Sequence, residues 1–179
     1  MSERWELSES LKPVTFSWPE QMLCGLTGVV RRVLSREKGY NDKFEGELTF
    51  DPDIFGVMGE AAVAKHLNIY FNYSINNFDQ PDVGRFQVRT ALGHYKNLLI
   101  QKKDNGDEPF ILVTTENGRE YFIRGWQWAR EAQKEEYLKE MRGNEFYLFP
   151  REELRPMSEL IKWSEEEDRR SSQQQGTSP

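Results

Sequence analysis

The 179-residue sequence contains one cysteine and two histidines, and this shortage excludes several classes of site. Cys24 has no partner for an internal disulfide, which favours a reducing compartment and a cytoplasmic location. Because Cys24 lies in an apolar helical pattern, we expect a structural thiol rather than a nucleophile. His66 and His94 are too few and too scattered for a zinc site, so we interpret both as structural or surface residues.

The sequence also lacks a long apolar run and an excess of positive charge. No stretch of about 18 apolar residues exists, and the N-terminal residues do not follow the basic-then-apolar pattern of a signal peptide. Lys and Arg number 24 against 30 Asp and Glu, which gives a formal net charge of −6. We therefore expect no membrane partner and no binding of nucleic acid over the whole surface.

Aromatic residues are plentiful, at 13% of the chain, and they indicate a well-packed core. The length fits one domain, which we place at residues 1–163. After Trp163 the sequence becomes acidic and then rich in Gln and Ser. We interpret residues 164–179 as a disordered polar tail, because nothing in them offsets the entropy of ordering.

Two helices are predicted in the first half of the chain. Ser17 and Glu20 form a capping-box pattern, and the helix that follows should end near Gly39. Its apolar residues recur at helical spacing at Leu23, Leu26, Val30 and Val33. A second helix should run from Asp51 to about residue 67. Glu60 lies on the same face of this helix as Val57, Ala64 and Leu67, so a carboxylate interrupts an apolar stripe.

The remaining pattern is rich in strands. Residues 69–73 suit a strand, and an antiparallel β-meander is predicted at about 85–91, 96–103, 110–115 and 119–124. The turns Asp104-Asn105-Gly106 and Glu116-Asn117-Gly118 are Asn-Gly hairpin signals. A charged helix at 127–142, closed by Gly143, and a last strand at 146–149 complete the prediction. The fold class is α/β with α+β character, a meander flanked by helices.

Four polar residues are candidates for a common site. Asp82 follows Pro81 at the mouth of a predicted strand. On that strand Gln87 and Arg89 are two residues apart and share a face. If the helix that carries Glu60 packs on this face, two carboxylates and an amide converge, and such oxygens suit Mg²⁺ or Mn²⁺. A bound cation activates water against a phosphodiester, and Arg89 would stabilise the developing charge.

A local basic strip lies beside these residues. No Asp or Glu occurs from residue 83 to 103, whereas the stretch contains Arg85, Arg89, Lys96, Lys102 and Lys103. Such a strip on an acidic protein indicates an anionic partner, and DNA is the natural candidate. The alternative is a solvated sheet face whose cations pair with acidic residues elsewhere in the fold.

The pattern resembles the PD-(D/E)xK nuclease superfamily. The resemblance rests on Gly59-Glu60 in a helix, Pro81-Asp82, and Gln87-Val88-Arg89 on the next strand. Over residues 55–156 the chain is similar to a group of phage-encoded proteins placed near these nucleases; the shared pieces include Gly125-Trp126 and Phe149-Pro150. The resemblance implies a metal-dependent DNA endonuclease in the host cytoplasm, with Glu60, Asp82 and Gln87 as metal ligands and catalytic residues alongside Arg89.

Two positions depart from the pattern of that superfamily. Gln87 replaces a carboxylate, as in Mrr-like restriction enzymes. Arg89 replaces the lysine, and arginine stays protonated and is bulkier. A catalytically degenerate relative that binds DNA is therefore an alternative, and so is a protein-interaction module that blocks a host enzyme. The form of DNA, its sequence and the oligomeric state are left open.

Each candidate residue also has a structural interpretation. Glu60 could pair with an arginine, which is the common fate of a lone carboxylate on an apolar face. Asp82 could form an Asx turn before the strand. Gln87 and Arg89 could lie on the solvated side of a half-exposed strand.

Overall fold

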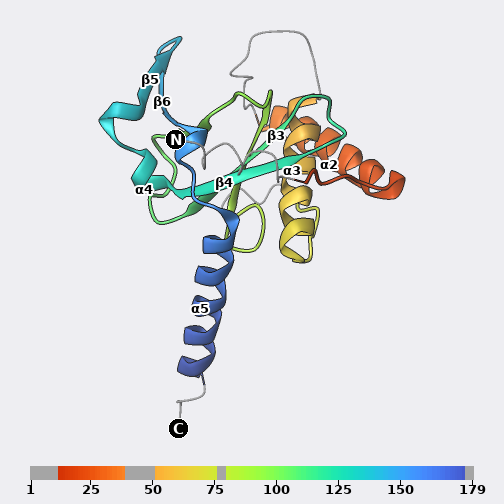
Figure 1. The fold of residues 1–179 in the computed structure, drawn as a ribbon. Helices are drawn as coiled ribbons and strands as arrows, with labels where there is room; N and C mark the ends of the chain where they lie inside the picture. The colour runs from red at the N-terminus through yellow and green to blue at the C-terminus, as the bar shows by residue number, and fades with distance from the viewer. Residues whose placement is uncertain (1–11, 39–50, 76–79, 176–179) are drawn as a thin grey trace.

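A computed structural model describes residues 12–38, 51–75 and 80–175 of the chain. Figure 1 shows a central β-structure with two helices on one side and a long C-terminal helix that extends away from it. The helices are α2 (Trp18–Glu37), α3 (Asp51–Leu67), α4 (Ala129–Ala132) and α5 (Met157–Gln175). The strands are β1 (Gln87–Leu92), β2 (Leu98–Gln101), β3 (Pro109–Thr115), β4 (Phe122–Trp128), β5 (Leu138–Met141) and β6 (Asn144–Phe149). This mixture confirms the α+β class.

The two N-terminal helices begin where local signals place them. The backbone N–H of Ser17 donates a hydrogen bond of 2.6 Å to the carboxylate of Glu20, as the capping box predicts. Helix α3 begins at Asp51 and ends at Leu67, and both bounds are as predicted. Helix α2 ends at Glu37, shortly before the predicted end.

The strands form two three-stranded sheets, so the predicted antiparallel meander is wrong. In the first sheet β3 is central; it pairs with β1 in parallel and with β4 in antiparallel orientation. Strand β2 belongs to the second sheet, where it pairs with β6, and β6 also pairs with β5. Only the Asn117-Gly118 hairpin, between β3 and β4, is confirmed. The predicted hairpin at Asp104-Asn105-Gly106 is instead a loop that connects β2 of the second sheet to β3 of the first. No hairpin forms there because β2 pairs with β6, which lies more than 40 residues further along the chain.

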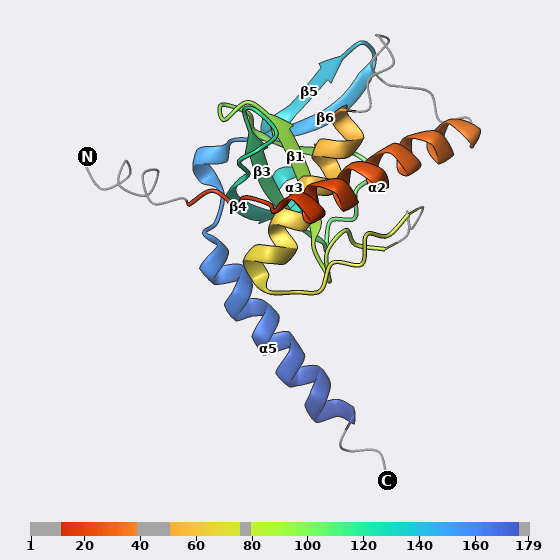
Figure 2. The same ribbon diagram turned by 90° about the vertical axis from the view of Figure 1, so that its right-hand side faces the viewer.

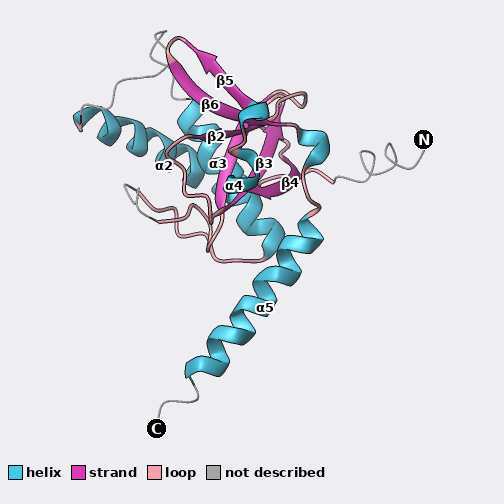
Figure 3. Cartoon of the chain, turned by 90° about the vertical axis from the view of Figure 1, so that its left-hand side faces the viewer, coloured by secondary structure: helices cyan, strands magenta, loops and turns pink. Residues whose placement is uncertain are grey.

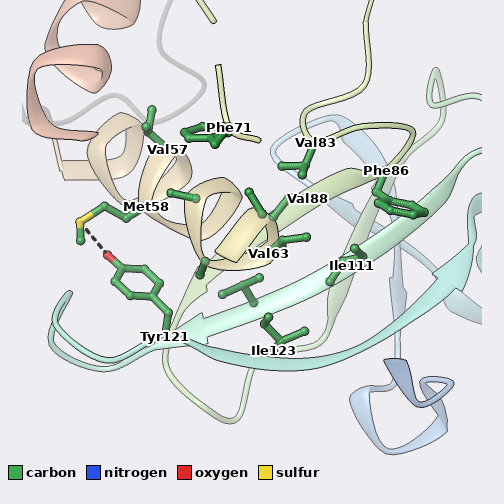
Figure 4. Close-up of a cluster of buried hydrophobic side chains, with 14 of the residues drawn as sticks. Val57, Met58, Val63, Phe71, Val83, Phe86, Val88, Ile111, Tyr121 and Ile123 are labelled. Atoms are coloured by element: carbon green, nitrogen blue, oxygen red, sulfur yellow. Dashed lines mark hydrogen bonds between the residues drawn. The ribbon is translucent and has the colours of Figure 1, made fainter. Parts of the chain in front are cut away.

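Strand β3 divides the core into two layers. Its residues Ile111 and Val113 pack with the apolar side chains of α3 and β1, whereas Phe110 and Leu112 pack with β2 and β6. All seven of its residues are buried, as expected for a strand covered on both faces. Figure 4 shows the first layer, where the hydroxyl of Tyr121 lies 3.4 Å from the sulfur of Met58.

The segment predicted as a charged helix at 127–142 is mostly not helical. Strand β4 continues to Trp128, α4 is one turn, and a 3-10 turn at Glu135–Tyr137 leads into β5. The β5–β6 hairpin turns at Arg142 and Gly143, both with positive φ. Figure 3 shows this hairpin projecting from the body of the molecule. Residues 69–73, predicted as a strand, contain no regular element.

Helix α5 covers most of the segment that the sequence predicted as a disordered tail. Residues 164–175 are helical, so the prediction is wrong for them. Leu160 is fully buried and Trp163 packs edge-on against Trp128, which anchors the first turns. Figure 2 shows the rest of α5 extending beyond the body. Within the described ranges, no helix is both long and apolar enough to cross a membrane.

Candidate functional site: a buried carboxylate and arginine cluster

Helix α3 lies unusually close to β1 at the point where it carries the candidate carboxylate. A Cβ atom added to Gly59 would lie 1.8 Å from the hydroxyl oxygen of Thr90, so only glycine permits this approach. The next residue, Glu60, is 7% exposed although it is charged. The sequence pair Gly59-Glu60 therefore does two linked things: the glycine brings the helix onto the strand, and the glutamate enters the interior there.

Glu60 is held by an arginine from the neighbouring helix. Arg31 of α2 donates hydrogen bonds of 2.7 and 2.8 Å to the two carboxylate oxygens of Glu60, and its Nε donates to the carbonyl of Ser74 at 2.9 Å. Burial raises the pKa of Glu60, and the hydrogen bonds from Arg31 act in the opposite direction. The arginine thus supplies the opposite charge that a buried carboxylate needs.

Asp82 lies close enough to interact electrostatically with Glu60. Its carboxylate accepts a hydrogen bond of 2.8 Å from the backbone N–H of Val88, across a tight turn closed by a bridge between Val83 and Phe86. Burial raises the pKa of Asp82, and the charge of Asp82 contributes to the raised pKa of Glu60. The structure therefore brings these two predicted site residues together, and Asp82 also closes a local turn.

Gln87 and Arg89 share one face of β1, as their spacing predicts, and Phe86 and Val88 enter the core on the other. Arg89 forms an ion pair of 2.9 Å with Asp104 and lies 4.6 Å from the ring centre of Phe110. The amide nitrogen of Gln87 donates to Glu108 at 3.0 Å. Both side chains therefore contact acidic residues of the loop that follows β2.

This arrangement does not fit a divalent cation at Glu60, Asp82 and Gln87. Both oxygens of Glu60 accept hydrogen bonds from Arg31, and the amide of Gln87 is directed to Glu108. Over residues 12–38, 51–75 and 80–175, no group of three or more His, Cys, Asp or Glu side chains is placed to hold a metal ion. A metal ligand shell would require Arg31 to leave Glu60.

The basic strip of the sequence is divided among several places in the fold. Arg85 pairs with Asp168 of α5, and Lys102 pairs with Glu145 of β6. Lys96 lies before β2, 4.8 Å from the ring centre of Tyr95, whereas Lys102 and Lys103 follow the far end of the same strand. Arg85, Arg89 and Lys102 therefore pair with acidic residues elsewhere in the fold, as the structural alternative predicts.

Arg31 and Asp104 belong to the site, and the sequence analysis missed both. Arg31 is separated from Glu60 by 29 positions and lies on another helix. Its signal is present in the sequence, because Arg31 continues the face of Cys24, Thr27 and Gly28, which are the buried residues of α2. Asp104 was read as part of a hairpin turn, whereas its carboxylate accepts hydrogen bonds from Arg89 and from the backbone of Gln101.

The sequence predicts Cys24, His66 and His94 as structural or surface residues, and His66 is exposed in the last turn of α3. Cys24 is fully buried, which confirms that it belongs to the core, and burial raises the pKa of its thiol to about 11. His94 lies 3.1 Å from the hydroxyl of Thr114.

No protein-family model, curated protein or solved structure matched the chain.

Proposed function

We propose that this protein is a nuclease-like scaffold that acts by binding another protein, and that its carboxylate cluster serves the fold rather than DNA cleavage. The observation that carries the proposal is the contact between Arg31 and Glu60. A guanidinium is permanently charged and takes both oxygens of the carboxylate that the nuclease resemblance would give to a metal. An arginine in that place neutralises Glu60 without supplying a Lewis acid.

The distribution of charge favours a protein partner over DNA. Of the basic strip, Arg85, Arg89 and Lys102 each contact a carboxylate of the same chain, and the net charge is −6. When unpaired cations of a protein neutralise the phosphates of DNA, the counterions condensed on the DNA are released, and this release supplies much of the free energy of binding. Cations that already pair with acids offer less of this gain. A host protein remains the proposed partner class for a phage-type chain.

A second candidate is the metal-dependent deoxyribonuclease, with Mg²⁺ or Mn²⁺ as its cofactor. One observation favours it: Glu60 and Asp82 lie within electrostatic reach, and burial raises the pKa of both. Two such carboxylates gain from a nearby cation, and Arg31 fills that role for Glu60 in this structure. This candidate requires a rearrangement of Arg31.

Thermal melting with and without Mn²⁺, together with nicking of supercoiled plasmid, separates the two candidates. For the wild-type protein we expect no shift of Tm and no nicking. Arg31→Ala frees the oxygens of Glu60, so a Mn²⁺-dependent rise in Tm in this variant alone would support the view that the arginine replaces the cation. Stabilisation and nicking by the wild type, both lost in Asp82→Ala, would establish the nuclease instead.

DNA binding needs its own measurement. We expect fluorescence anisotropy with a labelled duplex to show no binding at about 150 mM salt, where nonspecific complexes are weak. The double variant Lys102→Glu/Lys103→Glu is the matched probe of the basic strip. Wild-type affinity that falls in this variant, with a flatter salt dependence, would show that the strip binds DNA.

A further inference from the structure

A second charged cluster lies where β3 and β4 face the second sheet. Thr114 of β3 is fully buried there. Its hydroxyl oxygen accepts a hydrogen bond of 2.7 Å from Nε of Arg124 in β4 and lies 3.1 Å from Nδ1 of His94, in the loop between β1 and β2. Arg151, which follows β6, donates from Nη1 to the backbone carbonyl of His94. Two arginines and a histidine from three separate segments therefore meet at one place in the fold.

The ring of Phe122 fixes two of these groups. The guanidinium of Arg124 lies 5.2 Å from the centre of this ring, and the ring of His94 packs edge-on against it, with 4.8 Å between ring centres. Phe122 and the hydroxyl of Thr114 thus hold Arg124 and His94 in place. A ligand that meets both side chains does not have to order them first, so less conformational entropy is lost on binding.

Arg124 is the extra residue of a β-bulge. Leu112 lies opposite Gly125 and Val113 lies opposite Ile123, so Arg124 has no partner on β3. In a regular ladder Arg124 would lie opposite Leu112, a fully buried residue of the second apolar layer. Bulges change the direction of a side chain and are common next to functional sites. Here the bulge releases Arg124 from that layer and lets its Nε reach the hydroxyl of Thr114.

Arg124 carries a charge that the described fold does not neutralise. Arg31, Arg85 and Arg89 each form an ion pair with a carboxylate from another element or loop. Within residues 12–38, 51–75 and 80–175, Arg124 forms no ion pair, and its hydrogen bond to Thr114 goes to a neutral group. Burial lowers the pKa of Arg124, and the positive charge of Arg151 acts in the same direction. An anion next to both guanidinium groups would offset both effects.

Two carboxylates border the cluster without occupying it. Glu116 accepts a hydrogen bond of 3.1 Å from the backbone N–H of His94, and the charges of Glu116 and Glu120 both act on the His94 ring. Both glutamates are exposed, and neither lies within ion-pair distance of Arg124. Glu152 pairs with the Nε of Arg151 at 2.7 Å, at the surface. A ligand must therefore attract the arginines more strongly than these acids repel it, which favours two negative charges over one.

We propose that Arg124, Arg151 and His94 bind the phosphate dianion of a phosphate monoester. The terminal nitrogens of Arg124 form a planar fork that matches two phosphate oxygens, and two guanidinium charges balance a dianion. The contact of Nδ1 with Thr114 leaves Nε2 of His94 to donate to a further oxygen. The site shares no residue with the Arg31–Glu60 cluster, so the inference is independent of the protein-binding role proposed above.

The two histidines of the chain provide the test, because NMR resolves the titration of each ring. The probe is inorganic phosphate at about 10 mM, which saturates a millimolar site, against chloride of equal ionic strength. Burial and the charge of Arg124 lower the pKa of His94. A bound dianion favours the imidazolium, so this pKa should rise by roughly 0.5–1 in phosphate. The pKa of His66, exposed on α3, should stay unchanged.

Three variants show whether the arginines carry the effect. Arg124→Gln and Arg151→Gln should each weaken phosphate binding at least about tenfold, because each removes one of two charges. Arg119→Gln is the matched control, since Arg119 is an exposed arginine of the same β3–β4 hairpin. It should bind phosphate like the wild type. The titration of His66 reports whether each variant is folded, and Arg151→Gln tests the site if Arg124→Gln is not.

Two further ligands identify the source of the phosphate. A short peptide that contains phosphoserine represents a modified protein, and a nucleoside monophosphate represents a small molecule; the one that saturates His94 at the lower concentration names the source. The inference is overturned if the pKa of His94 is the same in phosphate and chloride. It is also overturned if both histidines shift equally, or if the shift of His94 persists in Arg124→Gln and Arg151→Gln.

Discussion

Arg31 and Glu60 form a two-bond ion pair that joins α2 to α3, with N–O distances of 2.7 and 2.8 Å. The side chain of Glu60 is 9% exposed and that of Arg31 is 22% exposed, so the arginine reaches from the edge of the molecule to a buried charge. The pair satisfies Glu60 and helps to hold α2 on α3, together with the ion pairs Arg32–Asp53 at 3.5 Å and Glu20–Lys65 at 2.9 Å.

Removing Arg31 should destabilise the protein strongly. In Arg31→Met the carboxylate of Glu60 stays buried without its partner, and we expect a loss of about 2–4 kcal/mol in the free energy of unfolding. The double variant Arg31→Met/Glu60→Met should recover most of this loss, because two apolar side chains of similar volume replace the pair. Urea unfolding of the two variants measures the difference. Equal losses in both would show that the charge of Glu60 has another partner.

Replacing Asp82 by asparagine should raise stability at neutral pH. Burial raises the pKa of Asp82 in the folded protein above 3.8, the value in the unfolded chain. Protonation of Asp82 therefore makes its full contribution to the free energy of unfolding below about pH 3.8. This contribution is lost as the pH rises through the folded pKa. Asparagine keeps an acceptor for the N–H of Val88 and carries no charge. The advantage of Asp82→Asn should therefore be present at pH 7 and shrink as the pH falls toward 4. Urea unfolding at several pH values tests this; a variant less stable at pH 7 would contradict it.

The elements that follow from local chemistry were predictable from the sequence, and those that depend on distant pairing were not. The start of α2 follows from Ser17 and Glu20, and the β3–β4 turn follows from Asn117-Gly118. Residues 138–141 read as helix because Leu, Lys, Glu and Met are good helix formers. They are a strand because β6 pairs with them through a hairpin at Arg142 and Gly143. Tertiary pairing overrides propensity there.

The candidate site was also predictable only where it depends on local sequence. The burial of Glu60 on an apolar stripe and the shared face of Gln87 and Arg89 follow from periodicity alone. The partners Arg31 and Asp104 do not, because each meets its ion-pair partner through tertiary packing rather than local spacing. The large apolar side chains that recur at helical spacing in α2 are exposed. Their outward direction was equally hidden, since a helical stripe gives no sign of which side the fold will cover.

Shortening the chain should separate the anchored part of α5 from the extended part. A chain that ends at Ser164 loses Asp168, whose pair with Arg85 is exposed and contributes little. We expect its Tm to stay within about 2 °C of the full chain. A chain that ends at Pro156 also loses the buried Leu160 and the half-buried Trp163, and its Tm should fall by roughly 10 °C or more. A large fall in the first variant would show that residues 165–179 dock on the body.

The close approach of α3 to β1 predicts opposite effects of alanine at two glycines of one helix. At Gly56 an added Cβ meets nothing within 4 Å, so Gly56→Ala should gain about 0.5–1 kcal/mol from helix propensity. At Gly59 the added atom would lie 1.8 Å from the hydroxyl oxygen of Thr90 and 3.0 Å from its Cβ. Gly59→Ala must push α3 away from β1, and we expect a loss of about 1–3 kcal/mol.

Thr90 provides the rescue that identifies this clash as the cause. Its hydroxyl oxygen is buried with no hydrogen-bond partner in the described part of the chain, so Thr90→Ala alone should cost little. In Gly59→Ala/Thr90→Ala the shortest contact is gone, and part of the loss should return. Urea unfolding of the wild type, the two single variants and the double variant gives the coupling between the two positions. If Gly59→Ala were as stable as Gly56→Ala, α3 would not rest on β1, and the burial of Glu60 next to Gly59 would need another cause.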